Sequence, residues 1–269
     1  QTFYGSSYRQ RPVEHILQEI QSIRDRSKLI FFVNDNIFSD RTAARELLEA
    51  LIPLKARWVS QGSIDLGRDE GFLKLLRASG CQGLLIGFES LDADNLRQMG
   101  KGVNLAQGDF EQAMENLRKY GIRVYGTFVF GYDNDTPETF DRAYDFAVRH
   151  GLYLCGFNHL IPMPGTALYQ RLANEGRLLY DAWWLDEGYS YNTVPFRPAR
   201  MSPEDVKECC LQARRRFYSI PSTLRRALHP SNRSDWFFLQ AFFALNWLHR
   251  AEINQRNALP LGDSNRRGP

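Results

Sequence analysis

The 269-residue sequence predicts an α/β fold with a parallel sheet, followed by a C-terminal helical extension. In the first two thirds of the chain, short apolar runs alternate regularly with amphipathic helical patterns. Continuous apolar strands joined by helices are typical of βαβ units, in which helices cover the sheet. No G-x-G-x-x-G or G-x-x-x-x-G-K-S/T motif occurs at a strand–helix junction. This disfavours a dinucleotide-binding or P-loop sheet, and it leaves a barrel and an open doubly wound sheet as alternatives.

The predicted elements follow one another without long gaps. A helix is expected to begin after Pro12, and a short strand follows at 28–33. Asp40 is suited to cap the next helix, because its carboxylate can accept hydrogen bonds from the first free N–H groups. The further elements are a strand near 58–64, a helix ended by Gly80, a strand at 83–88, a helix around 110–117 ended by Gly121, a strand at 123–130, a helix capped by Thr136 that starts at Pro137 and is closed by Gly151, and a strand at 152–161.

The alternation ends near residue 175, where a helical region begins. One helix is expected to begin at Ser202-Pro203 and another to span 236–254. The apolar run in the second helix is interrupted by Gln240 and Asn246 and is too short to span a bilayer, so we expect a buried or docking helix. The sequence therefore predicts an α/β sheet region (1–175), a helical extension (176–256) and a disordered tail (257–269).

Composition narrows the function classes. The net charge of +3 gives no strong indication of a nucleic-acid partner or an acidic membrane surface. We expect the arginine runs 214–216 and 225–226 to lie on solvated helix faces. The four cysteines, at 81, 155, 209 and 210, lack metal-ligand spacing and are interpreted as reduced thiols. The N-terminal residues do not form a signal peptide, and a cytoplasmic location is expected.

Polar residues follow each predicted strand, where a βα barrel has its active site. They are Asn34-Asp35-Asn36, Ser63-Ile64-Asp65, Glu89-Ser90, Thr127 with Asp133-Asn134-Asp135, and Asn158-His159. Each group also has a structural explanation, since Asx-turns and helix caps use the same residue types. The rim has no nucleophile elbow and no histidine pair with metal spacing. Its acceptors and amides favour holding a polar ligand, such as a nucleoside, over acid–base hydrolysis.

Several segments, in order, resemble radical S-adenosylmethionine enzymes. They are Phe3-Tyr4-Gly5 with Tyr8–Pro12, Phe32–Phe38, Gly80-Cys81 with Ile86–Ser90, Met99–Asn104, Phe130-Gly131 with Asp135–Thr139, and Pro162–Tyr169. The resemblance covers roughly residues 1–175. It implies a partial (β/α)6 barrel of TIM type, with five strands in this chain and the first strand missing upstream.

The chain departs from that family at the cluster motif, because C-x-x-x-C-x-x-C is absent. Matching begins at the first residue, which is Gln, so we expect the cluster cysteines to lie just before Gln1 and this fragment alone to be inactive. The alternative is a degenerate barrel that acts as a binding or scaffold protein. An unrelated barrel lyase or hydrolase is a second alternative.

The resemblance implies two cofactors, a [4Fe–4S] cluster bound upstream of Gln1 and S-adenosylmethionine bound at the rim. Together they generate a 5′-deoxyadenosyl radical or support cobalamin-dependent methyl transfer. The segment 197–203 is similar to enzymes that carry a cobalamin-binding domain, which makes cobalamin a third expected cofactor. The expected partners are a small-molecule substrate and an electron donor such as flavodoxin or ferredoxin, with no nucleic acid.

The resemblance also assigns cofactor-binding residues. Glu89 matches the acidic or amide position that touches the cofactor, and Lys101 matches the basic position that pairs with its methionyl carboxylate. Ser63 and Thr127 match strand positions near the ribose and the methionine. Asn34, Asp35 and Asn36 are expected to line the methionine amine or the substrate. No catalytic residue and no metal ligand is assigned within the chain.

Overall fold

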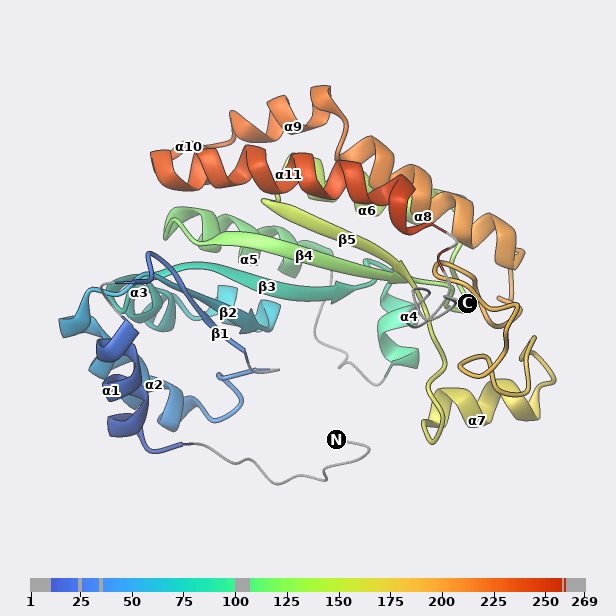
Figure 1. Ribbon diagram of the computed structural model, residues 1–269, viewed down its shortest axis with the longest axis horizontal. Coiled ribbons are helices and arrows are strands. Elements are labelled where there is room, and N and C mark those ends of the chain that lie inside the picture. The colour runs from blue at the N-terminus through green and yellow to red at the C-terminus, as the bar shows by residue number, and fades with distance from the viewer. Residues whose placement is uncertain (1–10, 24–25, 34–35, 100–106, 258, 260–269) are drawn as a thin grey trace, which may run out of the picture.

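The centre of the protein is a five-stranded, all-parallel sheet with the strand order β1-β2-β3-β4-β5 (Figure 1). The computed structural model describes residues 11–23, 26–33, 36–99, 107–257 and 259. The strands are β1 (Ile30–Phe32), β2 (Trp58–Gly62), β3 (Cys81–Glu89), β4 (Arg123–Phe130) and β5 (Leu154–His159). Their order and direction confirm the predicted α/β fold with a partial-barrel sheet. The additional first strand of the barrel, expected upstream of these five, stays a prediction.

Helices follow the strands and continue into the C-terminal extension. They are α1 (Val13–Ile23), α2 (Arg41–Leu51), α3 (Glu70–Ala78), α4 (Ala93–Gln98), α5 (Gln107–Lys119), α6 (Pro137–Arg149), α7 (Ala167–Asn174), α8 (Pro203–Phe217), α9 (Ile220–Ala227), α10 (Pro230–Arg233) and α11 (Trp236–Arg256), with 3₁₀ turns at Ile52–Leu54 and Ile64–Arg68. The predicted caps are confirmed, since Asp40 accepts bonds from the N–H groups of Thr42 and Ala43, and Thr136 opens α6 with a capping box. The helices α4, α7, α9 and α10 were not predicted, because eight residues or fewer give little periodicity.

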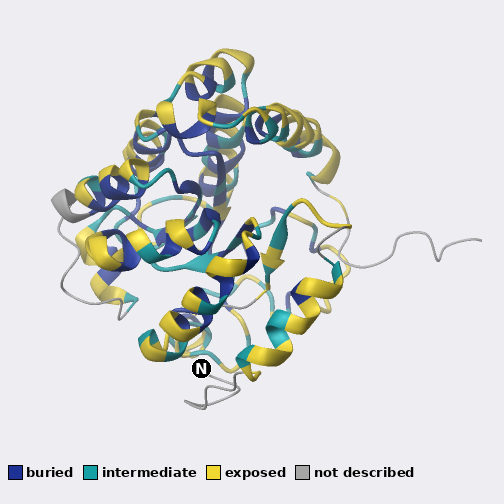
Figure 2. Ribbon diagram, turned by 90° about the vertical axis from the view of Figure 1, so that its left-hand side faces the viewer, coloured by how far each residue is buried: buried dark blue, intermediate teal, exposed yellow. Residues whose placement is uncertain are grey.

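The two faces of the sheet have different environments. On the helix-covered face, Phe88 and Phe128 are fully buried and stack with ring centroids 5.2 Å apart. On the other face, alternate residues of β3 and β4, such as Leu85 and Tyr125, stay partly exposed. Figure 2 shows the buried residues gathered where helices meet the sheet. Among the described residues this second face, the open face, is therefore the less covered of the two. The carboxyl ends of the strands point toward α4 and α7 (Figure 1).

The C-terminal extension is fixed to β5 by a buried arginine. Arg226 is 0% exposed, and its guanidinium donates to the carbonyl oxygens of Leu152 and Phe217, at 3.1 and 2.8 Å, and to Oδ1 of Asn246 at 2.8 Å. Burial lowers the pKa of Arg226 to about 10. The prediction that both members of the run 225–226 lie on a solvated face is therefore right for the exposed Arg225 and wrong for Arg226.

Asn246, which interrupts the apolar run of α11, is buried rather than solvated. Its Nδ2 donates to the carbonyl oxygens of Tyr153 and Phe242, at 3.2 and 2.8 Å. Within the described part of the chain, no helix is both long and apolar enough to cross a membrane. The predicted disordered tail falls largely outside the described residues, and the predicted domain boundaries stay predictions.

Candidate functional site

Glu89 and Thr127 come together on the open face of the sheet. Thr127 is paired in register with Gly87, two residues before Glu89. A Cβ atom placed on Gly87 would lie 2.6 Å from Oε1 of Glu89 and 3.7 Å from Oγ1 of Thr127. The carboxylate therefore folds back over the glycine, beside the threonine hydroxyl. A side chain at position 87 would occupy this cradle, which explains the glycine.

The backbone at Glu89 is unusual for a residue with a side chain. Its φ of 62° lies in the left-handed region, and the register with β4 shifts between Gly87 and Glu89. The carbonyl oxygen of Phe88 accepts a bond from the N–H of Ser90 across this turn, at 2.8 Å. Such backbone is costly and is concentrated at binding and catalytic sites, so the bulge indicates that the direction of the Glu89 side chain matters.

Two other predicted site residues that the structure describes, Ser63 and Asn36, follow β2 and β1. Ser63 follows β2 directly, and its hydroxyl donates to Asp65, which also pairs with Arg41 at 2.7 Å. Asn36 accepts a bond from the N–H of Phe38 at 3.0 Å, in the Asx-turn that was the structural alternative. Asn34, Asp35 and Lys101 lie outside the described residues. The cofactor contacts of all these residues stay predictions.

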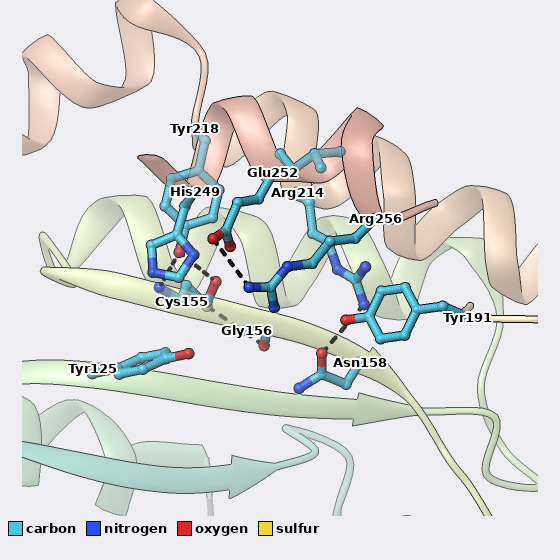
Figure 3. A pocket seen from close by; sticks show the side chains of 11 residues that line it. Tyr125, Cys155, Gly156, Asn158, Tyr191, Arg214, Tyr218, His249, Glu252 and Arg256 are labelled. Atoms are coloured by element: carbon cyan, nitrogen blue, oxygen red, sulfur yellow. Dashed lines mark hydrogen bonds and ion pairs between the residues drawn. The ribbon is translucent and has the colours of Figure 1, made fainter. Parts of the chain in front are cut away.

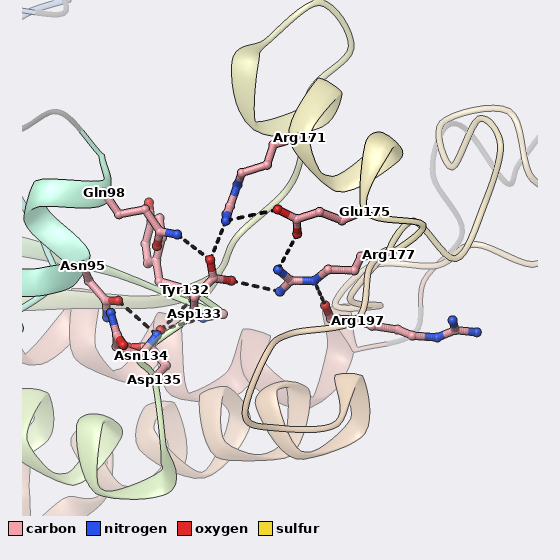
Figure 4. Close-up of polar contacts among 11 residues, drawn as sticks. Asn95, Gln98, Tyr132, Asp133, Asn134, Asp135, Arg171, Glu175, Arg177 and Arg197 are labelled. Carbon is pink, nitrogen blue, oxygen red and sulfur yellow. Dashed lines mark hydrogen bonds and ion pairs between the residues drawn. The ribbon is translucent and has the colours of Figure 1, made fainter.

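The polar residues after β4 form a network that holds the rim loops (Figure 4). Asp135 is buried and accepts bonds from the N–H groups of Gly131 and Tyr132, at 2.8 and 3.0 Å, and from Nδ2 of Asn95, at 2.8 Å. Burial raises the pKa of Asp135 to about 6.

Asp133, two residues earlier, joins three elements of this network (Figure 4). It accepts bonds from Gln98 of α4, Arg171 of α7 and, at 2.9 Å, Arg177. Both carboxylates are engaged within the protein, so they position α4 and α7 beside the site rather than offering a ligand contact.

The described residues do not fit an iron–sulfur cluster. Cys81, Cys155 and Cys210 are buried, Cys209 is half-buried, and all four are free thiols. Burial raises the pKa of Cys81 and Cys210 to about 12, which disfavours the thiolate needed for ligation. Among residues 11–257, apart from the undescribed gaps, no three His, Cys, Asp or Glu side chains gather as a metal site.

A cavity of about 170 Å³, lined by polar residues, lies between β4–β5 and the helices α8 and α11 (Figure 3). Arg214 of α8 reaches into it and donates to the carbonyl oxygen of Phe157 at 2.8 Å and to Oδ1 of Asn158 at 3.2 Å. The expectation of a solvated face is therefore wrong for Arg214, although it holds for the exposed Arg215 and Arg216. No local pattern in the chain separates Arg214 from its two neighbours.

The sequence matches one protein family and several characterised relatives. The profile of the Radical SAM superfamily matches residues 2–147. The bacteriochlorophyllide d C-12(1)-methyltransferase of Chlorobaculum tepidum is 31% identical over 240 residues, which are 88% of this chain and 51% of the relative. The hopanoid C-2 methylase of Rhodopseudomonas palustris is 27% identical over 243 residues, 85% of this chain and 45% of the relative. The chain thus spans about half the length of these relatives.

Solved structures share the fold at lower identity. The radical S-adenosylmethionine methyltransferase TsrM from Kitasatospora setae, with cobalamin and a [4Fe–4S] cluster bound, gives a TM-score of 0.57 at 20% identity over 74% of this chain and 41% of that chain. The cobalamin-dependent S-adenosylmethionine radical enzyme OxsB gives a TM-score of 0.59 at 13% identity over 93% of this chain and 43% of that chain. At these identities the likeness concerns the fold.

Proposed function

The chain belongs to the radical S-adenosylmethionine superfamily, and from this premise we propose that it is the cofactor-binding barrel of a cobalamin-dependent methyltransferase acting on a small molecule. Members of this superfamily bind a [4Fe–4S] cluster and S-adenosylmethionine, in agreement with the cofactors expected from the sequence. Methyl transfer is supported by the names of the relatives at 31% and 27% identity. Cobalamin is supported by the names of the two solved structures.

The observation that carries the proposal is the position of Glu89 over Gly87. S-adenosylmethionine, when bound, supplies the reactive methyl and adenosyl carbons. The contribution of this chain is to bind and orient it. Glu89 offers acceptor oxygens on the open face, and the Thr127 hydroxyl beside it can accept or donate. Ser63 on the rim, Lys101 and residues 34–36 complete the proposed set.

The four cysteines are buried or half-buried, and the described residues hold no group of three metal ligands, so they do not fit the cluster. In the complete natural protein its ligands would have to be other residues. The electron donor of the reaction, a flavodoxin or a ferredoxin, is likewise part of the proposal.

The test uses the complete natural protein, reconstituted anaerobically with iron and sulfide. We expect binding of S-adenosylmethionine in equilibrium dialysis and, with reduced flavodoxin, formation of S-adenosylhomocysteine or 5′-deoxyadenosine. Glu89→Gln should weaken cofactor binding about tenfold, because a charge-assisted hydrogen bond contributes about 1.5–3 kcal/mol. Glu46→Gln, on the exposed face of α2, serves as the control. A protein that binds neither iron nor S-adenosylmethionine would instead be the scaffold alternative.

A further inference from the structure

We infer that the cavity between β5 and the C-terminal helices binds the anionic group of the substrate, a carboxylate or a phosphate. The inference rests on the proposed function, because it assigns the substrate class of the same enzyme. The cavity is similar in size to one of ~150 Å³ that accepts a benzene ring, so it can hold one end of a small molecule. Its polar lining comes from four elements: Tyr125 of β4, Asn158 of β5, Arg214 of α8, and His249, Glu252 and Arg256 of α11 (Figure 3).

The charges around the cavity favour an anion. Arg256 pairs with Glu252 at 3.1 Å, which leaves Arg214 in excess. Arg214 is half-buried, and among the described residues its hydrogen-bond acceptors are all neutral: the Phe157 carbonyl and the side-chain oxygens of Asn158 and Asn192. A cation held by neutral acceptors keeps its full charge for an anion that enters the cavity.

The neutral polar groups of the lining are suited to donate. His249 stacks on Tyr218 with ring centroids 5.1 Å apart, and burial lowers its pKa, so it carries one N–H and no charge near neutral pH. Burial raises the pKa of Tyr125, which therefore keeps its phenolic proton. With the arginines, these groups surround the cavity with hydrogen-bond donors, as an anion requires.

Asn158 lies between the cavity and the part of the open face, near Thr127, that is proposed to bind S-adenosylmethionine. Because Arg214 donates to Oδ1 of Asn158, the amide must direct its Nδ2 donor elsewhere. A Cβ atom placed on Gly156 would lie 3.1 Å from this Nδ2 and 3.4 Å from Cγ2 of Thr127. The donor thus lies over the open face of the sheet, next to the threonine assigned to S-adenosylmethionine. A substrate held by its anionic end would extend its carbon skeleton over that face, within reach of the methyl donor.

The test is ligand binding by the complete natural protein, measured by saturation-transfer NMR titration with benzoate, phenylphosphonate and the neutral benzamide. We expect at least one of the two anions to bind more tightly than benzamide, and the preferred one identifies a carboxylate or a phosphate. Arg214→Gln should weaken anion binding about tenfold, and Arg256→Gln about threefold, because Arg256 is already paired. Arg225→Gln, an exposed arginine of α9, should change nothing.

Two further outcomes decide the inference. Arg214 also joins α8 to β5, so Arg256→Gln, whose residue is exposed and contacts Glu252, is the variant that tests binding without risk to the fold. Equal binding of anions and benzamide, or anion binding that neither variant weakens, would overturn the inference. Binding of S-adenosylmethionine is measured in parallel. If the protein binds the anions but not S-adenosylmethionine, only the proposed function is contradicted. If it binds S-adenosylmethionine but not the anions, only the assignment of the cavity is contradicted.

Discussion

An arginine of the C-terminal extension contacts each end of β5, and the two arginines have different roles. At the amino end, Arg226 is fully buried and bonded to carbonyl and amide oxygens on several sides. At the carboxyl end, Arg214 contacts the strand in the same way but opens onto a cavity. Both are cations held by neutral acceptors. They differ in enclosure: Arg226 is closed off as an anchor of the fold, whereas Arg214 borders the cavity proposed to bind a ligand.

Arg226→Leu removes the anchor at the amino end of β5. The change leaves buried acceptors at Leu152, Phe217 and Asn246 without their donor, and each such loss costs about 1–3 kcal/mol. We expect the free energy of unfolding, measured in urea, to fall by about 3–5 kcal/mol. Arg225→Gln is the control and should stay within about 0.5 kcal/mol of the parent protein. A loss for Arg226→Leu below about 1 kcal/mol would contradict its role as an anchor.

In the loop that follows β4, the buried Asp135 predicts a pH dependence of stability. Burial raises its pKa from 3.8 to about 6 in the folded state, so over this range the folded protein binds more protons than the unfolded chain. Its contribution to stability is therefore greatest below pH 4 and is lost as the pH rises to about 6, by at most about 3 kcal/mol. Urea unfolding between pH 4 and 7 measures this. The slope should shrink in Asp135→Asn, and an unchanged slope would assign it to other groups.

Gly87→Ala extends the comparison between residues that stabilise the fold and residues that serve binding. It should weaken cofactor binding while leaving the fold intact. The new methyl group would meet the end of the Glu89 side chain, which can move, rather than backbone. We expect the free energy of unfolding to change by less than about 1 kcal/mol. Binding of S-adenosylmethionine should weaken about tenfold as the carboxylate is displaced. Equilibrium dialysis and a urea titration on one preparation give both values. A variant that is destabilised by more than about 1 kcal/mol but binds the cofactor with unchanged affinity would contradict the assignment.

The sequence predicts the part of the fold that depends on local patterns. The caps at Asp40 and Thr136 and the strand at 123–130 rest on neighbouring residues and were found as expected. The site is predictable only in part. Glu89 can be located from its motif, whereas its left-handed backbone and its return over Gly87 depend on the register with β4.

The cavity could not be predicted from the sequence. Arg214 meets residues 56 and 57 positions earlier in the chain, and α11 carries large apolar side chains on all sides, so no pattern indicates which face it turns to β5. The same reason explains Arg226 and Asn246. Their partners are supplied by the tertiary structure, and solvated and buried arginines look alike in a charge run.

The three consecutive arginines of α8 point in three directions. Arg214 meets β5, Arg215 bonds Asn254 of α11 at 3.5 Å, and Arg216 pairs with Asp141 of α6. Successive residues of a helix are about 100° apart around its axis. One residue inserted earlier in α8 would rotate all three by that angle and exchange their partners. The length of α8 up to position 214 therefore fixes which arginine faces β5, and grafts between related barrels should preserve it residue for residue.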